Sequence, residues 1–209
     1  MFLAYFFTAA WDCLQVPVYY RTFWLAKVVW LTHLNFIMQT IFTGLELLRA
    51  IWEDVYKRKR PDMRATLVTV TDLFYGYLVF PVSFVVTILF WTLWYIDPGL
   101  VVPKFDVDFL LPRWHNHMLH TAPGLFVLAD TCLIRHRLIS RKLAVGATTF
   151  FTLFYFGVLC SVRLIDGFWL YPIFNHLSPF QSVLFVAAGG CLFFSLCLLE
   201  FYLNLVIWA

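Results

Sequence analysis

The sequence predicts an all-α integral membrane protein with six transmembrane helices and a short interfacial segment between the fifth and the sixth. Of its 209 residues, 62% are hydrophobic and 21% are aromatic, whereas only 13% are charged. Soluble domains carry about 25% charged residues, so this composition indicates that lipid surrounds much of the chain. Apolar runs near the length of a bilayer crossing, about 20 residues, alternate with short polar connectors.

Six apolar runs define the predicted spans. The third is long for a bilayer and contains Pro81, which predicts a tilted or kinked helix. The segment GFWLYPIFNHL (167–177) is typical of the membrane interface because it is rich in aromatic residues. No stretch is long and polar enough for a separate soluble domain, so we expect residues 1–209 to form one membrane domain. The expected spans cover residues 2–20, 24–49, 66–96, 114–134, 143–164 and 180–208.

Lys and Arg residues predict the orientation. The connectors 56–64 and 135–142 hold nine of them and Arg49 adds a tenth, against five on the opposite side. The excess of positive charge places both connectors, and with six spans both termini, in the cytoplasm. We expect the N-terminal run to remain as the first span, because no basic region precedes it. The endoplasmic reticulum and the plasma membrane are both open, and no nucleic-acid partner is expected because no basic–aromatic motif or phosphate loop is present.

A stripe of polar residues runs along the second span. Their spacing of three or four residues places all of them on one helical face. One interpretation is that they join helices, at about 0.6–2 kcal/mol for each hydrogen bond. The other is that they line a polar cavity, because ionisable groups are costly inside a membrane and are often functional. The stripe consists of Thr32, Asn35, Gln39, Thr43 and Glu46.

The stretch RWHNHMLHT (113–121) contains His115, His117 and His120. On a helix His117 and His120 share one face. Zinc would need at least one further ligand, and the embedded carboxylate of Asp72 is expected at a different depth, so we expect no metal. We interpret His115 as interfacial, and His117 is open between helix packing and function. A general base is favoured for His120, since a neutral imidazole is tolerated in a membrane and can accept a hydroxyl proton.

Depth brings Thr32 and His120 together. At 1.5 Å per residue, Thr32 lies about 12 Å into its span and His120 about 10 Å past Arg113. A threonine hydroxyl becomes a nucleophile only beside a base, so the pair is a candidate hydrolytic site. From the residues alone, three functions remain nearly level. They are an ester hydrolase, a small transporter or proton pathway that uses the stripe and Asp72, and a non-enzymatic membrane adaptor.

Several motifs are similar to a known family in their order and spacing. From about Trp30 to Trp208, the chain resembles the androgen-induced and androgen-dependent TFPI-regulating membrane proteins, which are intramembrane threonine hydrolases of fatty acid esters of hydroxy fatty acids (FAHFAs). The resemblance implies that the nucleophile is Thr32 and the essential histidine is His120. It also implies six helices with cytoplasmic termini. The motifs are WLTHLNFIMQTIFTG, VFPVSFVVTILFW, VVPKFDVDFLLPRWHNHMLHT, GFWLYPIFNHL and LLEFYLNLVIW.

The expected chemistry is ester hydrolysis through an acyl-enzyme, without a cofactor. Asn35 and Asn116 are candidate oxyanion donors, and Asn116 and His117 are expected to support the base. The expected partners are a lipid ester substrate and the bilayer itself. No protein partner is implied.

Three further charged residues each have two possible roles. Lys104 and Arg113 are candidates to bind a free carboxylate of the lipid, although both can equally be interfacial residues that reach toward water. Asp72 can support catalysis or join helices.

The chain departs from the family pattern at Thr71, where a basic residue usually precedes the acid, and at Val102, where a tyrosine is usual.

Overall fold

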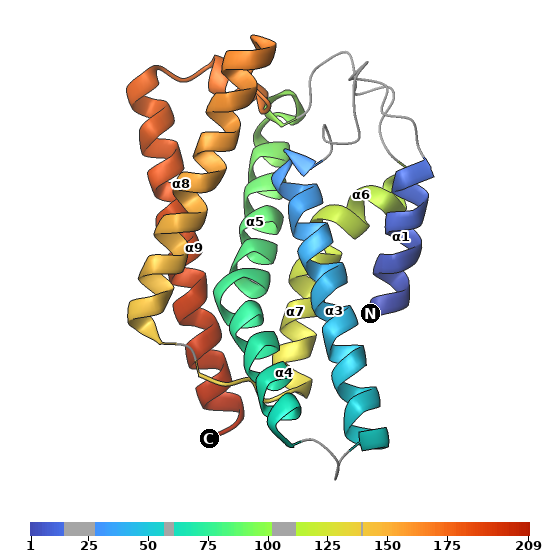
Figure 1. The fold of residues 1–209 in the computed structure, drawn as a ribbon. Helices are drawn as coiled ribbons and strands as arrows, with labels where there is room; N and C mark the ends of the chain where they lie inside the picture. Colours follow the sequence, from blue (N-terminus) through green and yellow to red (C-terminus); the bar gives the residue numbers. More distant parts are fainter. Residues whose placement is uncertain (15–27, 57–60, 102–111, 139) are drawn as a thin grey trace.

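A computed structural model describes residues 1–14, 28–56, 61–101, 112–138 and 140–209, and within these residues all regular secondary structure is helical. The predicted all-α class is therefore confirmed. The long helices run side by side as an elongated bundle (Figure 1). They are α1 (Phe2–Leu14), α3 (Leu31–Tyr56), α4 (Pro61–Phe74), α5 (Phe80–Ile96), α7 (Ala122–Leu133), α8 (Arg141–Asp166) and α9 (Pro179–Ile207).

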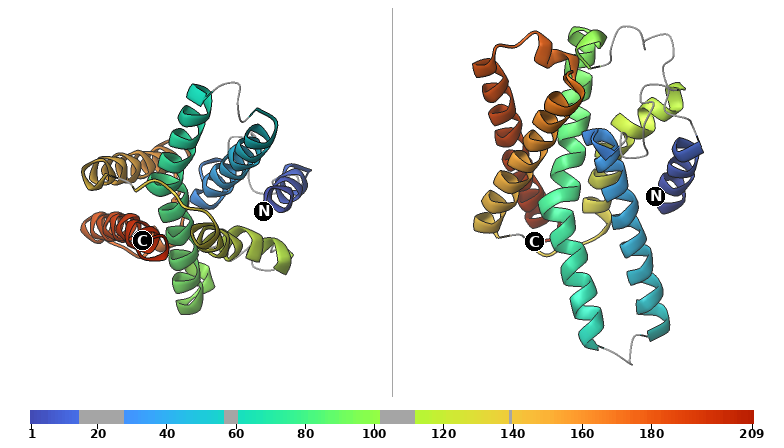
Figure 2. Two further views of the ribbon diagram at one scale, coloured as in Figure 1. Left: turned by 90° about the horizontal axis from the view of Figure 1, so that it is seen from below. Right: turned by 45° about the horizontal axis from the view of Figure 1, so that its top comes forward.

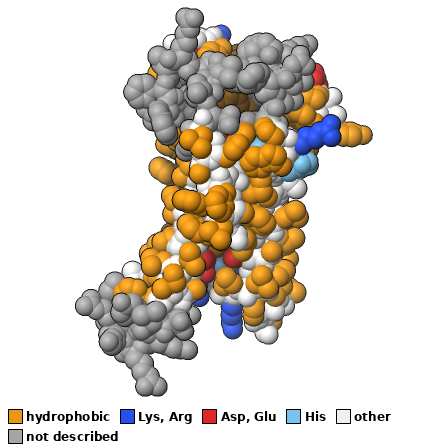
Figure 3. Space-filling model, turned by 90° about the vertical axis from the view of Figure 1, so that its right-hand side faces the viewer, with side chains coloured by type: hydrophobic (Ala, Val, Ile, Leu, Met, Phe, Trp, Pro, Cys, Tyr) orange, Lys and Arg blue, Asp and Glu red, His pale blue; other side chains and the backbone are white. Residues whose placement is uncertain are grey.

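Three helical stretches of the described chain are long and apolar enough to cross a membrane. They are Ala65–Ile96, Arg141–Asp166 and Pro179–Ile207, which correspond to the third, fifth and sixth predicted spans. The helix α7 is apolar but shorter. Hydrophobic side chains cover the middle of the face in Figure 3, as expected where lipid is the solvent. The count of six spans and the interfacial position of residues 167–177 stay predictions.

The end of the second predicted span differs from the structure. The helix α3 begins at Leu31 and continues to Tyr56, beyond the expected end at residue 49, and α1 is described as far as Leu14. Residues 15–20 of the first predicted span and 24–27 of the second lie outside the described residues. Because α3 begins at Leu31, Thr32 lies in its first turn, close to the end of the bundle.

The third predicted span is one continuous helix with a π-helical turn, η1 (Tyr75–Val79), between α4 and α5. Pro81 follows directly. Proline has no N–H to donate to the carbonyl four residues earlier, and its ring crowds that carbonyl. The wider turn before Pro81 is a common way to accommodate such a position within a helix.

The prediction of one continuous helix over residues 114–134 is wrong. The structure divides this run at Thr121 into α6 (Arg113–His120) and α7. Pro123 is the physical reason, because it cannot donate a hydrogen bond back along the helix at this point. In Figure 1 and the right panel of Figure 2, α6 lies across the bundle, steeply inclined to α7. The break turns the last residue of α6, His120, toward the other helices.

The helix α5 occupies the centre of the bundle, between α8 and α9 on one side and α3 and α7 on the other (Figure 2, left). Small residues bring the neighbouring helices close to each other. A Cβ atom added at Gly124 of α7 would lie 3.0 Å from Thr87 Oγ1 of α5, and one at Gly190 of α9 would lie 3.2 Å from Thr152 Oγ1 of α8. Such close approaches are typical of membrane helices, which gain their stability mostly from packing.

The segment between α8 and α9 packs against the start of α3. Gly167, with φ of 77°, ends α8, and a short 3-10 helix, η4 (Pro172–Asn175), follows. The ring of Tyr171 lies edge-on to that of Trp30, with centroids 5.2 Å apart. This segment therefore helps to fix the end of α3 that carries Thr32.

A larger side chain at Gly124 is expected to destabilise the bundle. Gly124→Leu would force α7 away from Thr87, and overpacking of this kind costs about 1–3 kcal/mol. The free energy of unfolding in mixed detergent micelles measures the effect. Gly146→Leu is the matched control, because a Cβ atom there meets no atom within 4 Å. Equal losses in both variants would contradict close packing at Gly124.

Candidate active site

Thr32 and His120 come together although 88 positions separate them in the chain. The hydroxyl oxygen of Thr32 lies 3.3 Å from Nε2 of His120. Thr32 is in the first turn of α3, and His120 is the last residue of α6, where the break before α7 turns its ring inward. The structure brings these two side chains together, as the argument from their depth in the membrane predicts.

Asn116 orients the ring of His120. Nδ1 of His120 lies 2.8 Å from Asn116 Oδ1 and 3.0 Å from the backbone carbonyl oxygen of the same residue. Because the carbonyl can only accept a hydrogen bond, Nδ1 must carry the proton. In the neutral ring Nε2 is then an acceptor that faces the hydroxyl of Thr32. The ring also stacks on Phe90 of α5, with centroids 3.4 Å apart and planes 9° apart.

A pair of tyrosines holds the start of α3. The backbone N–H of Leu31 donates to the hydroxyl oxygens of Tyr155 (2.7 Å) and Tyr171 (3.1 Å). The Tyr155 hydroxyl in turn donates to the carbonyl of Val29 at 3.0 Å. An N–H in the first turn of a helix has no partner within the helix. The two tyrosines therefore satisfy the N–H of the residue directly before Thr32 and limit the movement of that residue.

Thr32 lies in the wall of an apolar cavity of about 140 Å³. The helices α3, α5, α8 and α9 and the segment around η4 line the cavity, and aliphatic and aromatic side chains form most of its surface. Such walls can hold a hydrocarbon chain next to the hydroxyl, since burial of each CH₂ group contributes about 0.8 kcal/mol. The wall includes Val86, Leu89, Phe90, Phe151, Phe185 and Gly189.

The polar residues of the stripe on α3 make contacts of different kinds. Gln39 donates to Ser83 Oγ of α5 at 2.6 Å, and Ser83 Oγ lies 3.0 Å from Asn35 Oδ1. These residues join α3 to α5, as the helix-packing interpretation expects. Thr43 donates to the backbone of its own helix, and Glu46 pairs with Arg49. Thr32 is the member of the stripe whose hydroxyl lies beside His120.

Asn35 keeps one polar atom without a partner. Its side chain is fully buried, and its amide nitrogen has no hydrogen-bond partner in the described part of the chain. Asn35 lies one turn along α3 from Thr32, on the same face. An unpaired buried donor is costly, so this atom is a good candidate for a site that a ligand completes.

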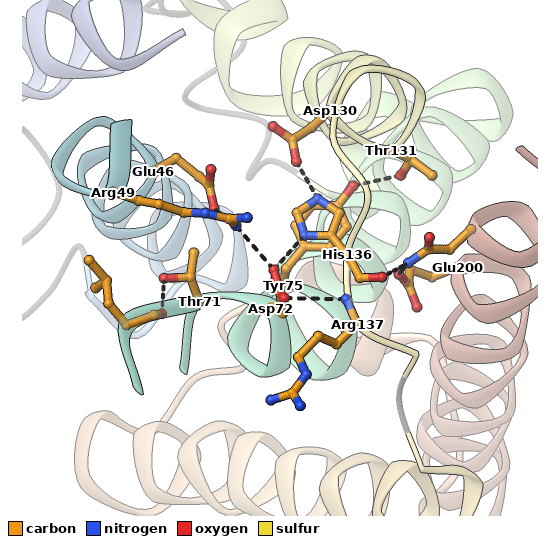
Figure 4. A network of polar contacts seen from close by, with 12 residues as sticks. Glu46, Arg49, Thr71, Asp72, Tyr75, Asp130, Thr131, His136, Arg137 and Glu200 are labelled. Carbon is orange, nitrogen blue, oxygen red and sulfur yellow. Dashed lines mark hydrogen bonds and ion pairs between the residues drawn. The ribbon is translucent and has the colours of Figure 1, made fainter. Parts of the chain in front are cut away.

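The remaining predicted site residues lie apart from Thr32. His117 is exposed; its Nδ1 atom lies 3.0 Å from Thr121 Oγ1, and its ring stacks on Trp91. Arg113 is exposed at the start of α6. Lys104 lies outside the described residues. Asp72 is at the opposite end of the bundle, within a second polar cluster (Figure 4).

His115 is buried among protein side chains, and its position at the membrane interface stays a prediction. Its side chain is fully buried beside Trp11, with ring centroids 4.6 Å apart. Asp12 of α1 lies between two histidines, with its oxygens 3.5 Å from Nε2 of His115 and 3.5 Å from Nε2 of His33. Among the residues that the structure describes, no group of three or more His, Cys, Asp or Glu side chains is arranged to hold a metal ion.

Sequence reasoning missed the second cluster. Asp130 and His136 lie six residues apart at the end of an apolar run, and the combination of an acid and a base there was the available signal. His136 bridges Asp72 and Asp130. The clue to Asn116 as the residue that orients His120 was its position four residues earlier, one helical turn away.

The chain is similar in sequence to several known proteins. The androgen-dependent TFPI-regulating protein of Mesocricetus auratus is 37% identical over 158 residues, which cover 75% of this chain and 66% of that protein. The human androgen-induced gene 1 protein is 28% identical over 182 residues, 85% of this chain and 76% of that protein. A UPF0641 membrane protein of Schizosaccharomyces pombe is 26% identical over 126 residues, 57% of this chain and 53% of that protein.

No solved structure matches the chain. The sequence profile of the FAR-17a/AIG1-like proteins matches residues 2–204, nearly the whole chain. The match includes both Thr32 and His120. Together with the relatives above, it identifies this membrane protein as a member of the FAR-17a/AIG1 family.

Proposed function

We propose that this protein hydrolyses fatty acid esters of hydroxy fatty acids within the membrane, with Thr32 as the nucleophile and His120 as the general base. The observation that carries the proposal is the contact between Thr32 Oγ1 and the acceptor nitrogen of His120, at the wall of an apolar cavity. A hydroxyl, a base and a residue that orients the base are the parts of a nucleophilic hydrolase site.

The first step forms an acyl-enzyme. His120 Nε2 takes the proton of Thr32 as the hydroxyl oxygen attacks the ester carbonyl carbon. The tetrahedral intermediate then collapses, the bond to the alcohol oxygen breaks, and His120 returns the proton to the departing hydroxy fatty acid. A well-placed base contributes about 10²–10⁴ in rate. The proton that Nδ1 donates to Asn116 keeps Nε2 free to do this.

The second step releases the fatty acid. A water molecule gives a proton to His120 as its oxygen attacks the acyl carbon on Thr32. Collapse of this intermediate breaks the bond to Thr32 Oγ1, which regains its proton from His120. The products are therefore one fatty acid and one hydroxy fatty acid, and the enzyme returns to its starting state.

The buried amide of Asn35 is suited to stabilise the oxyanion of both intermediates. Ser83 occupies its oxygen, and its nitrogen has no partner in the described part of the chain. A donor that is fixed before the reaction needs no reorganisation when the negative charge develops. The apolar cavity beside Thr32 would hold the acyl chain, which fits a substrate that comes from the bilayer.

A fluorophosphonate probe tests the nucleophile. We expect the adduct on Thr32 in the wild-type protein, and no adduct in Thr32→Val or His120→Ala. Loss of either residue should lower kcat/KM for a FAHFA by at least about 10³. The measurements are peptide mapping by mass spectrometry and the rate of fatty acid release.

Thr40→Val and His176→Ala are the matched controls. The hydroxyl of Thr40 bonds its own helix backbone, and His176 is exposed far along the chain. Both should label as the wild type does. Equal labelling of Thr32→Val, or a folded wild type that does not label, would exclude Thr32 as the nucleophile and favour a transporter or an adaptor.

Asn116→Ala is expected to lower kcat about tenfold with KM nearly unchanged, because only the backbone carbonyl would then hold the ring of His120. Asn116→Asp keeps an acceptor oxygen and should restore most of the rate. Steady-state kinetics measures both values. Asn175→Ala, at an exposed position, is the control. A rise in KM without a fall in kcat would argue that Asn116 contacts substrate instead.

A larger residue at Gly189 is expected to select against long acyl chains. A Cβ atom there meets no atom within 4 Å, and the residue lines the cavity. Gly189→Phe should lower kcat/KM for palmitoyl esters about tenfold and leave butyryl esters unaffected. Gly157→Phe on the exposed face of α8 is the control. If both chain lengths lose activity equally, the cavity does not hold the acyl chain.

A further inference from the structure

The cluster at the opposite end of the bundle is built around His136. Its Nδ1 atom lies 3.1 Å from Asp72 Oδ1 and its Nε2 atom lies 2.7 Å from Asp130 Oδ2. The ring stacks on Tyr75, with centroids 3.9 Å apart (Figure 4). Because both ring nitrogens face carboxylate oxygens, both carry a proton, and the ring is an imidazolium cation.

The surroundings of His136 hold this positive charge. Burial lowers the pKa of the imidazole, but the hydrogen bonds to Asp130 and Asp72 outweigh this and raise it to about 9. His136 therefore stays charged at neutral pH. It is in the connector between α7 and α8, outside the long apolar helices.

The two carboxylates that contact His136, those of Asp72 and Asp130, are matched by donors. Besides His136, Asp72 accepts from Arg49 Nη1 and from the backbone N–H of Arg137, each at 3.3 Å. Arg49 also pairs with Glu46 at 3.2 Å. The guanidinium groups of Arg135 and Arg137 have no carboxylate partner within the described chain, and Arg137 donates to the hydroxyl of Thr69. Two exposed cations therefore lie close to the paired carboxylates of Asp72 and Asp130.

These cations border a cavity of about 480 Å³. Its lining contains the basic side chains of Arg49, Arg135, His136 and Arg137, the carboxylate of Asp72, and the apolar side chains of Val68, Leu205 and Trp208. A water molecule occupies about 30 Å³ in the liquid, so a much larger group fits. Val68, near the start of the apolar stretch Ala65–Ile96, and Leu205, near the end of Pro179–Ile207, both line the cavity. If these stretches span the bilayer, the cavity is near the boundary between hydrocarbon and water.

We propose that this cavity binds the phosphate of an anionic phospholipid headgroup, with Arg135 and Arg137 as its ligands. Guanidinium groups match phosphate oxygens in geometry and charge, and basic pockets between membrane helices are suited to anionic headgroups. The apolar side chains of the lining would contact the first carbons of the lipid chains. The site is separate from the hydrolytic one, since Arg49 lies about five turns, or about 25 Å, along α3 from Thr32. It does not depend on the proposed hydrolase activity.

Binding of short-chain lipids to the purified protein in detergent tests the site. The probes are dioctanoyl phosphatidylinositol phosphate, dioctanoyl phosphatidylcholine, inositol phosphate and inorganic phosphate. We expect the anionic lipid to bind and to raise the melting temperature. Arg135→Gln with Arg137→Gln should weaken its binding at least tenfold, the usual loss for charged hydrogen bonds.

Arg141→Gln with Lys142→Gln is the matched control, because it removes the same charge from the same end of the molecule, outside the cavity wall. It should weaken binding less than threefold. If the variant with both Arg135→Gln and Arg137→Gln does not fold, Arg135→Gln alone can replace it in the test. Arg135 makes no hydrogen bond in the described structure, so this single substitution should not affect folding.

The outcomes separate the sources of the phosphate. Binding of the lipid but not of inositol phosphate or inorganic phosphate assigns a lipid headgroup. Equal binding of the soluble phosphates, with the same loss in the Arg135 and Arg137 variant, assigns a soluble phosphate ligand to the same site. Equal weakening by both pairs of substitutions, or equal binding of the anionic and zwitterionic lipids, would overturn the proposal.

Discussion

A protein that lipid surrounds must pair the polar groups it removes from water, because no solvent is present to satisfy them. This constraint explains the positions of most polar side chains here. Gln39, Ser83 and Asn35 join α3 to α5, and His136 is held between two carboxylates. A buried polar atom without a hydrogen-bond partner is an exception to this constraint and a candidate to bind a ligand. Within the described residues the amide nitrogen of Asn35 is one of several such atoms, and Asn35 lies one turn along α3 from Thr32.

The break between α6 and α7 is the second feature on which the site depends. A continuous helix would carry the ring of His120 along the bundle axis, whereas the break before Pro123 lays α6 across it. Close contact at Gly124 then brings α7 onto α5, where Phe90 stacks on the imidazole. At the other side of the site, Tyr155 and Tyr171 hold the first turn of α3. The hydroxyl of Thr32 and the imidazole of His120 therefore come from two helix ends, each of which is held in place by a different part of the bundle.

The sequence allowed the helical class and the meeting of Thr32 with His120 to be predicted, because composition and helical rise are properties of single segments. The break at Thr121 was missed, although Pro123 was visible, since a proline near a helix start can also be tolerated. Asn116 was expected to support His120, but its contact with the Nδ1 atom was not foreseen, and the bridge that His136 makes was missed. Asn116 acts through a side-chain rotamer, and His136 meets Asp72, which is far away in the chain. Contacts of these kinds depend on the packed structure rather than on local pattern.

The apolar lining of the cavity beside Thr32 has a consequence for measurement. In a bilayer or a micelle, hydrocarbon tails of the host lipid or detergent can enter a space with such walls, and an apolar ligand then competes with them. Occupancy then follows the mole fraction of ligand among amphiphiles rather than its concentration in water. Adding more detergent to a fixed amount of ligand would therefore weaken the apparent affinity with no change in the protein. Affinities measured in different preparations can be compared only when the ligand is expressed as its mole fraction among the amphiphiles.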